Sequence, residues 1–204
     1  MTESGTLLPT LDRLFAGPRD SVLTIKAFLE GLENRSYAFA ILALNVPNCV
    51  PTNIPWISTI TGVPMLLLIG QYFLGHEVPT LPDFVGRLGL PRGRLQDFLA
   101  GRTRRTIERI ENAIHPRRDW WVSGTPRKLM LAAWALLILL LALPIPFDNL
   151  IPAWAIAFFC FALIERDGTM AILGWLFTLL TVAWTAFLAT VGIVMVRHLL
   201  QVLF

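Results

Sequence analysis

Two long blocks of apolar residues, 37–74 and 129–197, constrain the fold of this chain more than any other part of its sequence. Each block is interrupted by a short segment rich in proline and asparagine, NVPNCVPTNIPW at 45–56 and IPFDNLIPAW at 145–154. Proline lacks a backbone donor and disrupts the interior of an α-helix. We therefore expect each block to form helices separated by a break.

The composition favours a membrane protein. Of the 204 residues, 55% are hydrophobic and 15% are charged, whereas an ordinary soluble domain is about 25% charged. The first residues lack a basic region followed by an apolar core, so we expect no cleaved signal peptide. Cys49 and Cys160 lie in apolar stretches and the three histidines are scattered, so we expect neither a metal nor a cofactor.

The predicted fold is an all-α integral membrane protein with about four or five short transmembrane or re-entrant helices, since a full span needs about 20 apolar residues. The helices form two repeated helix–break–helix units, because PTNIPW at 51–56 is similar to FDNLIPAW at 147–154, and Leu-Ala-Leu precedes both breaks. The expected organisation is an amphipathic N-terminal segment, a first membrane repeat, a basic amphipathic segment, and a second repeat with a C-terminal transmembrane helix. Their respective ranges are 1–36, 37–74, 75–128 and 129–204.

Residues 75–128 carry 11 of the 17 Lys and Arg residues against six acids. Apolar periodicity predicts amphipathic helices over 21–34 and 91–114, and a basic amphipathic helix beside membrane segments usually lies against anionic head groups. We expect a multi-pass protein of the bacterial inner membrane with both basic segments in the cytoplasm, which makes the two repeats parallel in their simplest form. Nucleic-acid binding is not expected.

The breaks and one charged triplet supply the candidate site residues. Irregular backbone at membrane depth is tolerated only where protein or a watery cavity surrounds it, and intramembrane charges are costly. A translocation or substrate site would then be formed by Asn48, Asn53, Gln71, Asn149, Glu165, Arg166 and Asp167. The alternatives are that the breaks are surface turns, and that the triplet is a polar loop in which Gly168 serves the turn.

Arginines of the basic segment are candidates for binding phosphate, because the guanidinium group makes bidentate contacts with phosphate oxygens. The predicted platform for a lipid head group consists of Arg102, Arg104, Arg105, Arg117 and Arg118.

Several short motifs, in this order, resemble the ExoD family of exopolysaccharide-synthesis proteins. They are NVPNCVPTNIP, TGVPMLLLIGQYFLG, the Leu-Pro at 81–82, the Pro-Arg at 116–117, LPIPFDNLIPA, and ERDG followed by GW. The resemblance covers roughly 20–195 and implies a bacterial inner-membrane protein associated with exopolysaccharide production and, in some members, with tolerance of alkaline pH. The first break departs from the family pattern, since it is rich in Asn and Pro and lacks Gly. The resemblance supplies no catalytic residues.

Two functions remain open from the sequence. The first is a transporter-like protein that handles a phosphate-bearing lipid carrier, such as polyprenyl-phosphate, or a small ion through broken helices. The second is a non-transporting accessory or scaffold subunit that holds other exopolysaccharide-synthesis proteins. We expect no enzyme, because Glu165 and Asp167 are two residues apart and would point to different faces of a helix. The small bundle also predicts a homodimer.

Overall fold

The computed structural model describes residues 7–51, 56–101, 104–105, 107–108, 124–143 and 149–203. This part of the chain is mostly helical, as predicted. Two of its helices are long and apolar enough to cross a membrane: α8 (Gly124–Ala142) and the stretch Gly168–Met195 of α10 (Gly168–Leu203). The number of spans and the repeated arrangement stay predictions.

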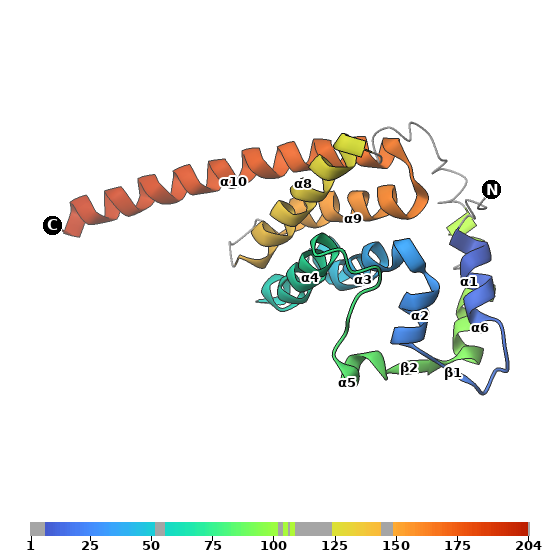
Figure 1. The fold of residues 1–204 in the computed structure, drawn as a ribbon. Helices are drawn as coiled ribbons and strands as arrows, with labels where there is room; N and C mark the ends of the chain where they lie inside the picture. Colours follow the sequence, from blue (N-terminus) through green and yellow to red (C-terminus); the bar gives the residue numbers. More distant parts are fainter. Residues whose placement is uncertain are drawn as a thin grey trace.

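The apolar blocks pack into one bundle. The helices α3 (Ser36–Asn45), α4 (Ile57–Phe73), α8, α9 (Leu150–Glu165) and the first part of α10 surround a common core (Figure 1). Trp134, Phe159 and Met65 are among its fully buried side chains. The residue Gly174 lets α10 approach α9 closely, since a Cβ there would lie 2.3 Å from the ring of Phe159.

Both breaks lie at the same end of this bundle. The last residue of α3, Asn45, contacts Ala153 in the first turn of α9. The end of α8 meets the start of α4, because a Cβ on Gly62 would lie 2.8 Å from the Cα of Ala142. Hence two helices end and two begin in one region, from which α3, α4 and α9 extend together in Figure 1.

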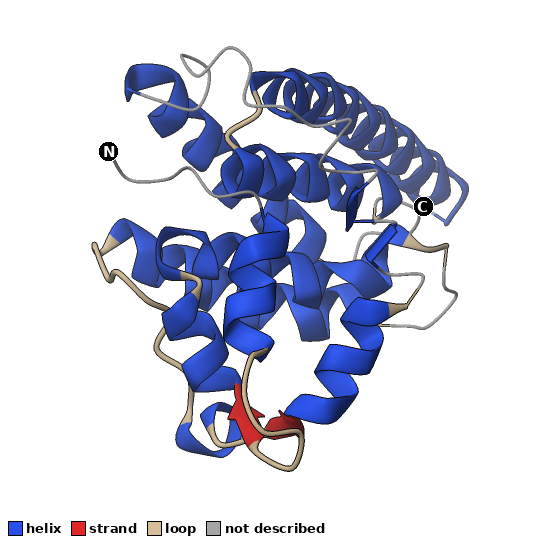
Figure 2. Cartoon of the chain, turned by 90° about the vertical axis from the view of Figure 1, so that its right-hand side faces the viewer, coloured by secondary structure: helices blue, strands red, loops and turns tan. Residues whose placement is uncertain are grey.

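The N-terminal and middle segments combine into a small unit beside the bundle. It contains α1 (Leu7–Phe15), β1 (Val22–Thr24), α2 (Ile25–Gly31), α5 (Asp83–Gly86), β2 (Gly89–Pro91) and α6 (Arg92–Ala100). The strands pair antiparallel, with Leu23 opposite Leu90, and Figure 2 shows them at the lower edge of the molecule. This unit has its own apolar core, formed by Leu8, Leu11, Phe15, Leu23 and Leu99.

Both predicted amphipathic helices are wrong in their extent. Residues 21–34 begin with β1, and α2 starts only after Thr24, whose hydroxyl accepts from the Ala27 amide at 3.3 Å; the 3₁₀ turn Glu33–Arg35 follows. The helix predicted over 91–114 starts at Arg92 and is interrupted at Gly101, whose ψ of −146° ends α6; residues 104–105 and 107–108 are helical again, and 109–114 lie outside the described residues. At the first place the pairing of β1 with the distant strand β2 overrides the apolar periodicity, and at the second place Gly101 does so.

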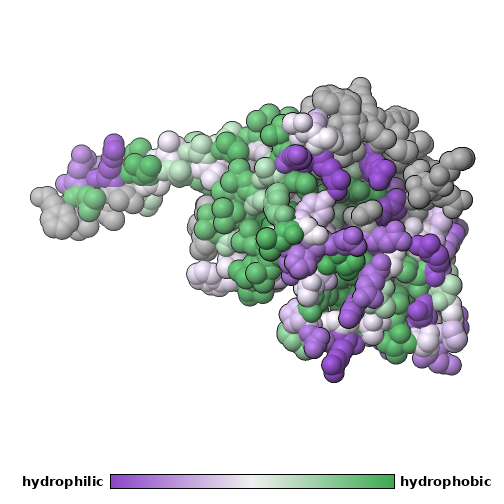
Figure 3. Space-filling view, in the orientation of Figure 1, coloured by the Kyte–Doolittle hydropathy of each residue, from purple (hydrophilic) through white to green (hydrophobic). Residues whose placement is uncertain are grey.

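The helix α10 is unbroken over 36 residues. At 1.5 Å per residue it is about 54 Å long, and Figure 1 shows it projecting beyond the other helices. Large apolar side chains are exposed along it, including Leu179 at 67% and Val194 at 66%. Figure 3 shows hydrophobic residues over the bundle and along α10, while hydrophilic residues gather on the small unit and near the tip of α10. An apolar surface of this kind suits lipid.

Candidate functional site

The first break begins where α3 stops. Pro47 follows Asn45 by two residues, and the chain makes a 3₁₀ turn, Val46–Cys49, before Val50 becomes extended. The side chain of Asn45 is fully buried, and its Nδ2 donates to the carbonyl oxygen of Ala153 at 2.7 Å. A weaker contact runs from the same nitrogen to Cys49 Sγ at 3.5 Å. This amide therefore fastens the first break to the start of α9.

The second amide in this region, Asn48, fastens the same break to α4. It is 3% exposed, and its Nδ2 donates to Thr61 Oγ1 at 2.8 Å. The Thr61 hydroxyl in turn lies 2.9 Å from Ile57 O and 3.3 Å from Ser58 O, so its proton is directed at the helix backbone. In this arrangement the hydroxyl donates to the α4 backbone and accepts from Asn48, so the nitrogen of the Asn48 amide faces Thr61.

Three amide oxygens in this region are left over. The buried Oδ1 atoms of Asn45, Asn48 and Asn149 have no hydrogen-bond partner among the residues that the structure describes. Asn149 directly precedes α9 and lies one helical turn before Ala153, whose amide donates to the Asn149 carbonyl at 3.2 Å. A buried acceptor without a partner costs about 1–3 kcal/mol. Such a group calls for a ligand, a water or an ion.

We call Asn45, Asn48, Thr61, Asn149 and Ala153 the break cluster. Sequence reasoning found Asn48 and Asn149 but assigned no role to Asn45 or Thr61. Asn45 stood in the same Pro- and Asn-rich stretch, so composition already pointed to it. Nothing in the sequence indicated that its partner would lie 108 residues away.

One of the predicted translocation residues has a structural role at the end of α4 that is opposite the break cluster. Gln71 pairs with the backbone of Thr80 through two hydrogen bonds, Nε2 to Thr80 O at 3.0 Å and Thr80 N to Oε1 at 2.7 Å. It thereby holds the connection that follows α4. The fourth predicted amide, Asn53, lies outside the described residues.

The charged triplet forms the turn between α9 and α10. Glu165 ends α9, and Arg166 follows in the left-handed region with φ 52° and an exposed side chain. Asp167 is 2% exposed and its Oδ1 accepts from the Thr169 amide at 2.6 Å, which caps α10. Arg166 rather than Gly168 thus makes the turn, and Gly168 is the first residue of α10.

Of the predicted phosphate platform, Arg104 and Arg105 lie in the described part, whereas Arg102, Arg117 and Arg118 lie outside it. Arg105 is exposed. Arg104 contacts both carboxylate oxygens of Asp12 at 3.2 Å and Glu108 at 3.2 Å. Donating to the Asp12 carboxylate raises the pKa of the Arg104 guanidinium. Its charge is therefore already matched by two acids.

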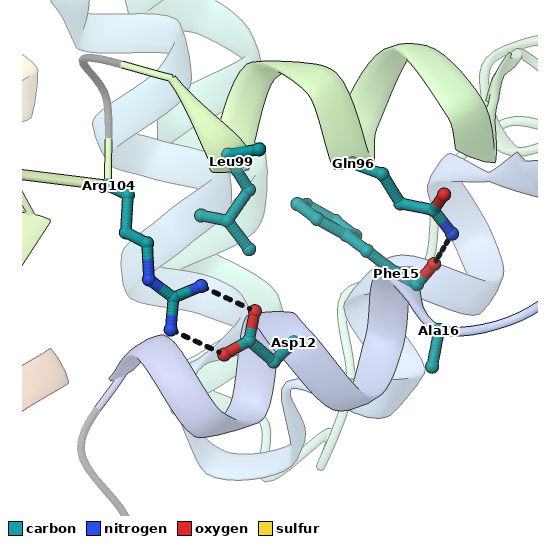
Figure 4. A pocket seen from close by; sticks show the side chains of 7 residues that line it. Asp12, Phe15, Ala16, Gln96, Leu99 and Arg104 are labelled. Carbon is teal, nitrogen blue, oxygen red and sulfur yellow. Dashed lines mark hydrogen bonds and ion pairs between the residues drawn. The ribbon is translucent and has the colours of Figure 1, made fainter.

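This ion pair closes one side of a small pocket of about 190 Å³ between α1 and α6. Figure 4 shows Arg104 reaching to Asp12, with Phe15 and Leu99 beside them. At the other side Gln96 Nε2 donates to Phe15 O at 2.8 Å, and Arg92 Nη1 donates to Leu14 O and Ala16 O at 2.5 and 2.6 Å. The last carbonyls of α1 are thus held by α6, and these polar groups serve the packing of the small unit.

Comparison with known proteins assigns the family. The sequence profile of the family described as "Exopolysaccharide synthesis, ExoD" matches residues 7–187. The curated protein named "Protein ExoD" from Rhizobium meliloti (strain 1021) is 25% identical over 194 residues, which cover 92% of this chain and 78% of that protein. No solved structure matches the chain. Together with the two long apolar helices, these matches indicate a membrane protein. The chain belongs to the ExoD family of exopolysaccharide-synthesis proteins.

Proposed function

We propose that this chain acts in exopolysaccharide synthesis as a transporter-like inner-membrane protein, whose two broken hairpins handle a small ion or a phosphate-bearing lipid carrier. One observation carries the proposal: two helix breaks meet in an apolar bundle, and three buried amide oxygens there have no partner among the described residues. Broken helices that bring polar groups together inside a membrane bundle are typical of transport sites.

The lack of charged residues among the five of the break cluster favours a small ion over a phosphate group as its occupant. None of the five residues of the break cluster is charged, and the groups left over are acceptors, which repel phosphate oxygens. A lipid phosphate would instead need the exposed Arg105 and the other arginines of the basic segment, since Arg104 is paired with Asp12 and Glu108.

The second candidate function is a scaffold, and the long helix α10 favours it. This helix projects beyond the bundle and exposes residues along its length such as Leu179, Phe187 and Val194 at 55–67%. In a membrane this surface could be covered by lipid, by a second copy of the chain or by another exopolysaccharide-synthesis protein. In that case the break cluster would only fix the packing of the hairpins, and homodimer formation stays a prediction.

Accessibility of single cysteines would separate the two functions. In a Cys49→Ser, Cys160→Ala background, one cysteine replaces Val50, which is 55% exposed beside the break cluster and leaves the three amides intact. The matched control replaces Leu179 on the apolar face of α10, 67% exposed. Both are labelled with a water-soluble maleimide in intact cells and in inverted vesicles, and lipid-depth quenching of the attached probe gives their positions.

Transport predicts that Val50→Cys reacts slowly from water although its probe lies deep in the membrane, while Leu179→Cys does not react. Rapid labelling of Val50→Cys from one side, with a probe at the surface, would show an ordinary loop and contradict the transport proposal. The scaffold would then be the remaining candidate.

A further inference from the structure

We propose that the break cluster binds a monovalent alkali cation through the amide oxygens of Asn45, Asn48 and Asn149. This inference rests on the proposed function, because it names the class of ion that the two breaks would handle. It is carried by three observations: amide nitrogens that are already hydrogen-bonded within the protein, deep burial, and the absence of charge among the five residues of the cluster.

The amide orientations determine which atoms face a ligand. The nitrogen of Asn45 points at the Ala153 carbonyl at 2.7 Å, and the nitrogen of Asn48 points at a hydroxyl that already donates to the α4 backbone. Reversing the Asn45 amide would place its oxygen against the Ala153 carbonyl, and reversing the Asn48 amide would require the Thr61 hydroxyl to turn away from the α4 backbone. Both nitrogens are therefore used by the protein, and both oxygens remain for a ligand that donates or carries positive charge.

The helix ends in this region do not decide the sign of the ligand. The helices α3 and α8 end here with partial negative charge, while α4 and α9 begin here with partial positive charge. The opposite partial charges of these helix ends offset one another. The amide oxygens of side chains that are 0% and 3% exposed, Asn45 and Asn48, then dominate the local potential and favour a cation.

The neutral ligand set favours a monovalent ion. Divalent cations in proteins are usually held by carboxylates and keep several waters, whereas rings of neutral oxygens suit alkali ions. None of the five residues of the break cluster supplies a carboxylate. The competing occupant is a buried water, which could donate to two of the three oxygens.

The test is the melting temperature of the purified full chain in detergent, measured in sodium, potassium or magnesium chloride and in choline chloride at equal ionic strength. At a concentration far above Kd, sodium or potassium should raise the melting temperature by about 5 °C relative to choline. Magnesium should leave it unchanged.

Two variants of Asn48 tie this effect to the cluster. Asn48→Leu should remove the dependence on the cation. Asn48→Asp should strengthen binding about 10-fold, because the Thr61 hydroxyl can turn to donate to the carboxylate while the second oxygen gains charge. The matched control is Thr190→Val on α10, whose hydroxyl bonds only its own helix among the described residues, and it should behave like the wild type.

Equal melting of the wild-type chain in sodium, potassium and choline would overturn the inference and leave water as the occupant. A cation effect that survives in Asn48→Leu and is unchanged in Asn48→Asp would overturn it as well. The cysteine labelling and the melting assay test the two proposals separately. Cation binding together with a surface position of the Val50→Cys probe would mean a structural ion. A deep position reached by water, without cation binding, would mean transport of another solute.

Discussion

Gly62 lies where α4 of the first hairpin packs against the end of α8 in the second, and its replacement by alanine gives the sharpest prediction. A Cβ at this position would lie 2.8 Å from both Cα and Cβ of Ala142 and 3.2 Å from its backbone nitrogen. Backbone atoms cannot rotate away, so α4 and α8 must separate. Gly70 on the same helix is the matched control, because a Cβ there meets nothing within 4 Å.

The magnitude follows from two opposing effects. Replacing glycine by alanine inside a helix stabilises the folded state by about 0.5–1 kcal/mol at either position. Forcing an extra methyl group into a packed contact costs about 1–3 kcal/mol. Gly70→Ala should therefore raise the free energy of unfolding slightly, and Gly62→Ala should lower it. The two variants should differ in free energy of unfolding by about 1–3 kcal/mol, which is the cost of the contact with Ala142. The gain from replacing a helical glycine is the same in both variants and cancels.

The assay is thermal unfolding of both variants in the same detergent. For a chain of this size, 1 kcal/mol corresponds to about 2–4 °C, so Gly62→Ala should melt about 2–12 °C below Gly70→Ala. Because this contact joins the end of α8 to the start of α4, Gly62→Ala should also reduce exopolysaccharide production more than Gly70→Ala does. Equal melting temperatures for the two variants would refute the close approach of α4 and α8.

Four further changes test other parts of the structure. Asp167→Ala should lower the free energy of unfolding by about 1 kcal/mol because it removes the cap of α10, and Asp167→Asn should restore most of it in the same melting assay. Arg166→Gly should raise that free energy by about 0.5–1 kcal/mol by relieving the left-handed backbone; a lower melting temperature would contradict the turn. The effect of Asp12→Asn on melting should be equal at about pH 7 and pH 10, because Asp12 raises the pKa of Arg104 above the ordinary value of an arginine. The stabilisation that this ion pair gives the folded state is complete at any pH below the ordinary pKa of arginine. It is lost only as the pH rises through the raised pKa of Arg104. Gln71→Leu should speed hydrogen exchange of the Thr80 amide, which it holds at 2.7 Å, and leave exchange in α9 unchanged.

The sequence was sufficient to predict the helical class and the position of the first break, whereas the role of Asn48 and Asn149 in a site stays a prediction. These predictions depend on local chemistry, since Pro47 prevents a helix from continuing through the break. The hydrogen bond between Asn45 and Ala153 was not predictable, because it depends on how two distant hairpins pack.

The small unit was predicted less well for a related reason. The strands β1 and β2 have three residues each, so neither shows a recognisable alternation, and they lie 65 positions or more apart along the chain. Gly89 reveals the pairing only in three dimensions, where a Cβ would lie 2.5 Å from Leu23 O. Arg166 likewise adopts a conformation that the neighbouring glycine was expected to take, because the packing of α10 on α9 fixes which residue makes the turn.

The bond from Asn45 to Ala153 also sets an order of events during synthesis. Its two residues are 108 positions apart, and a ribosome adds about 5–20 residues per second. Asn45 therefore exists for about 5–20 s before the carbonyl that accepts from its amide has been made. During that interval the nascent chain must keep Asn45 hydrated or held by the insertion machinery, so the first hairpin can settle at its final depth only after the second has arrived.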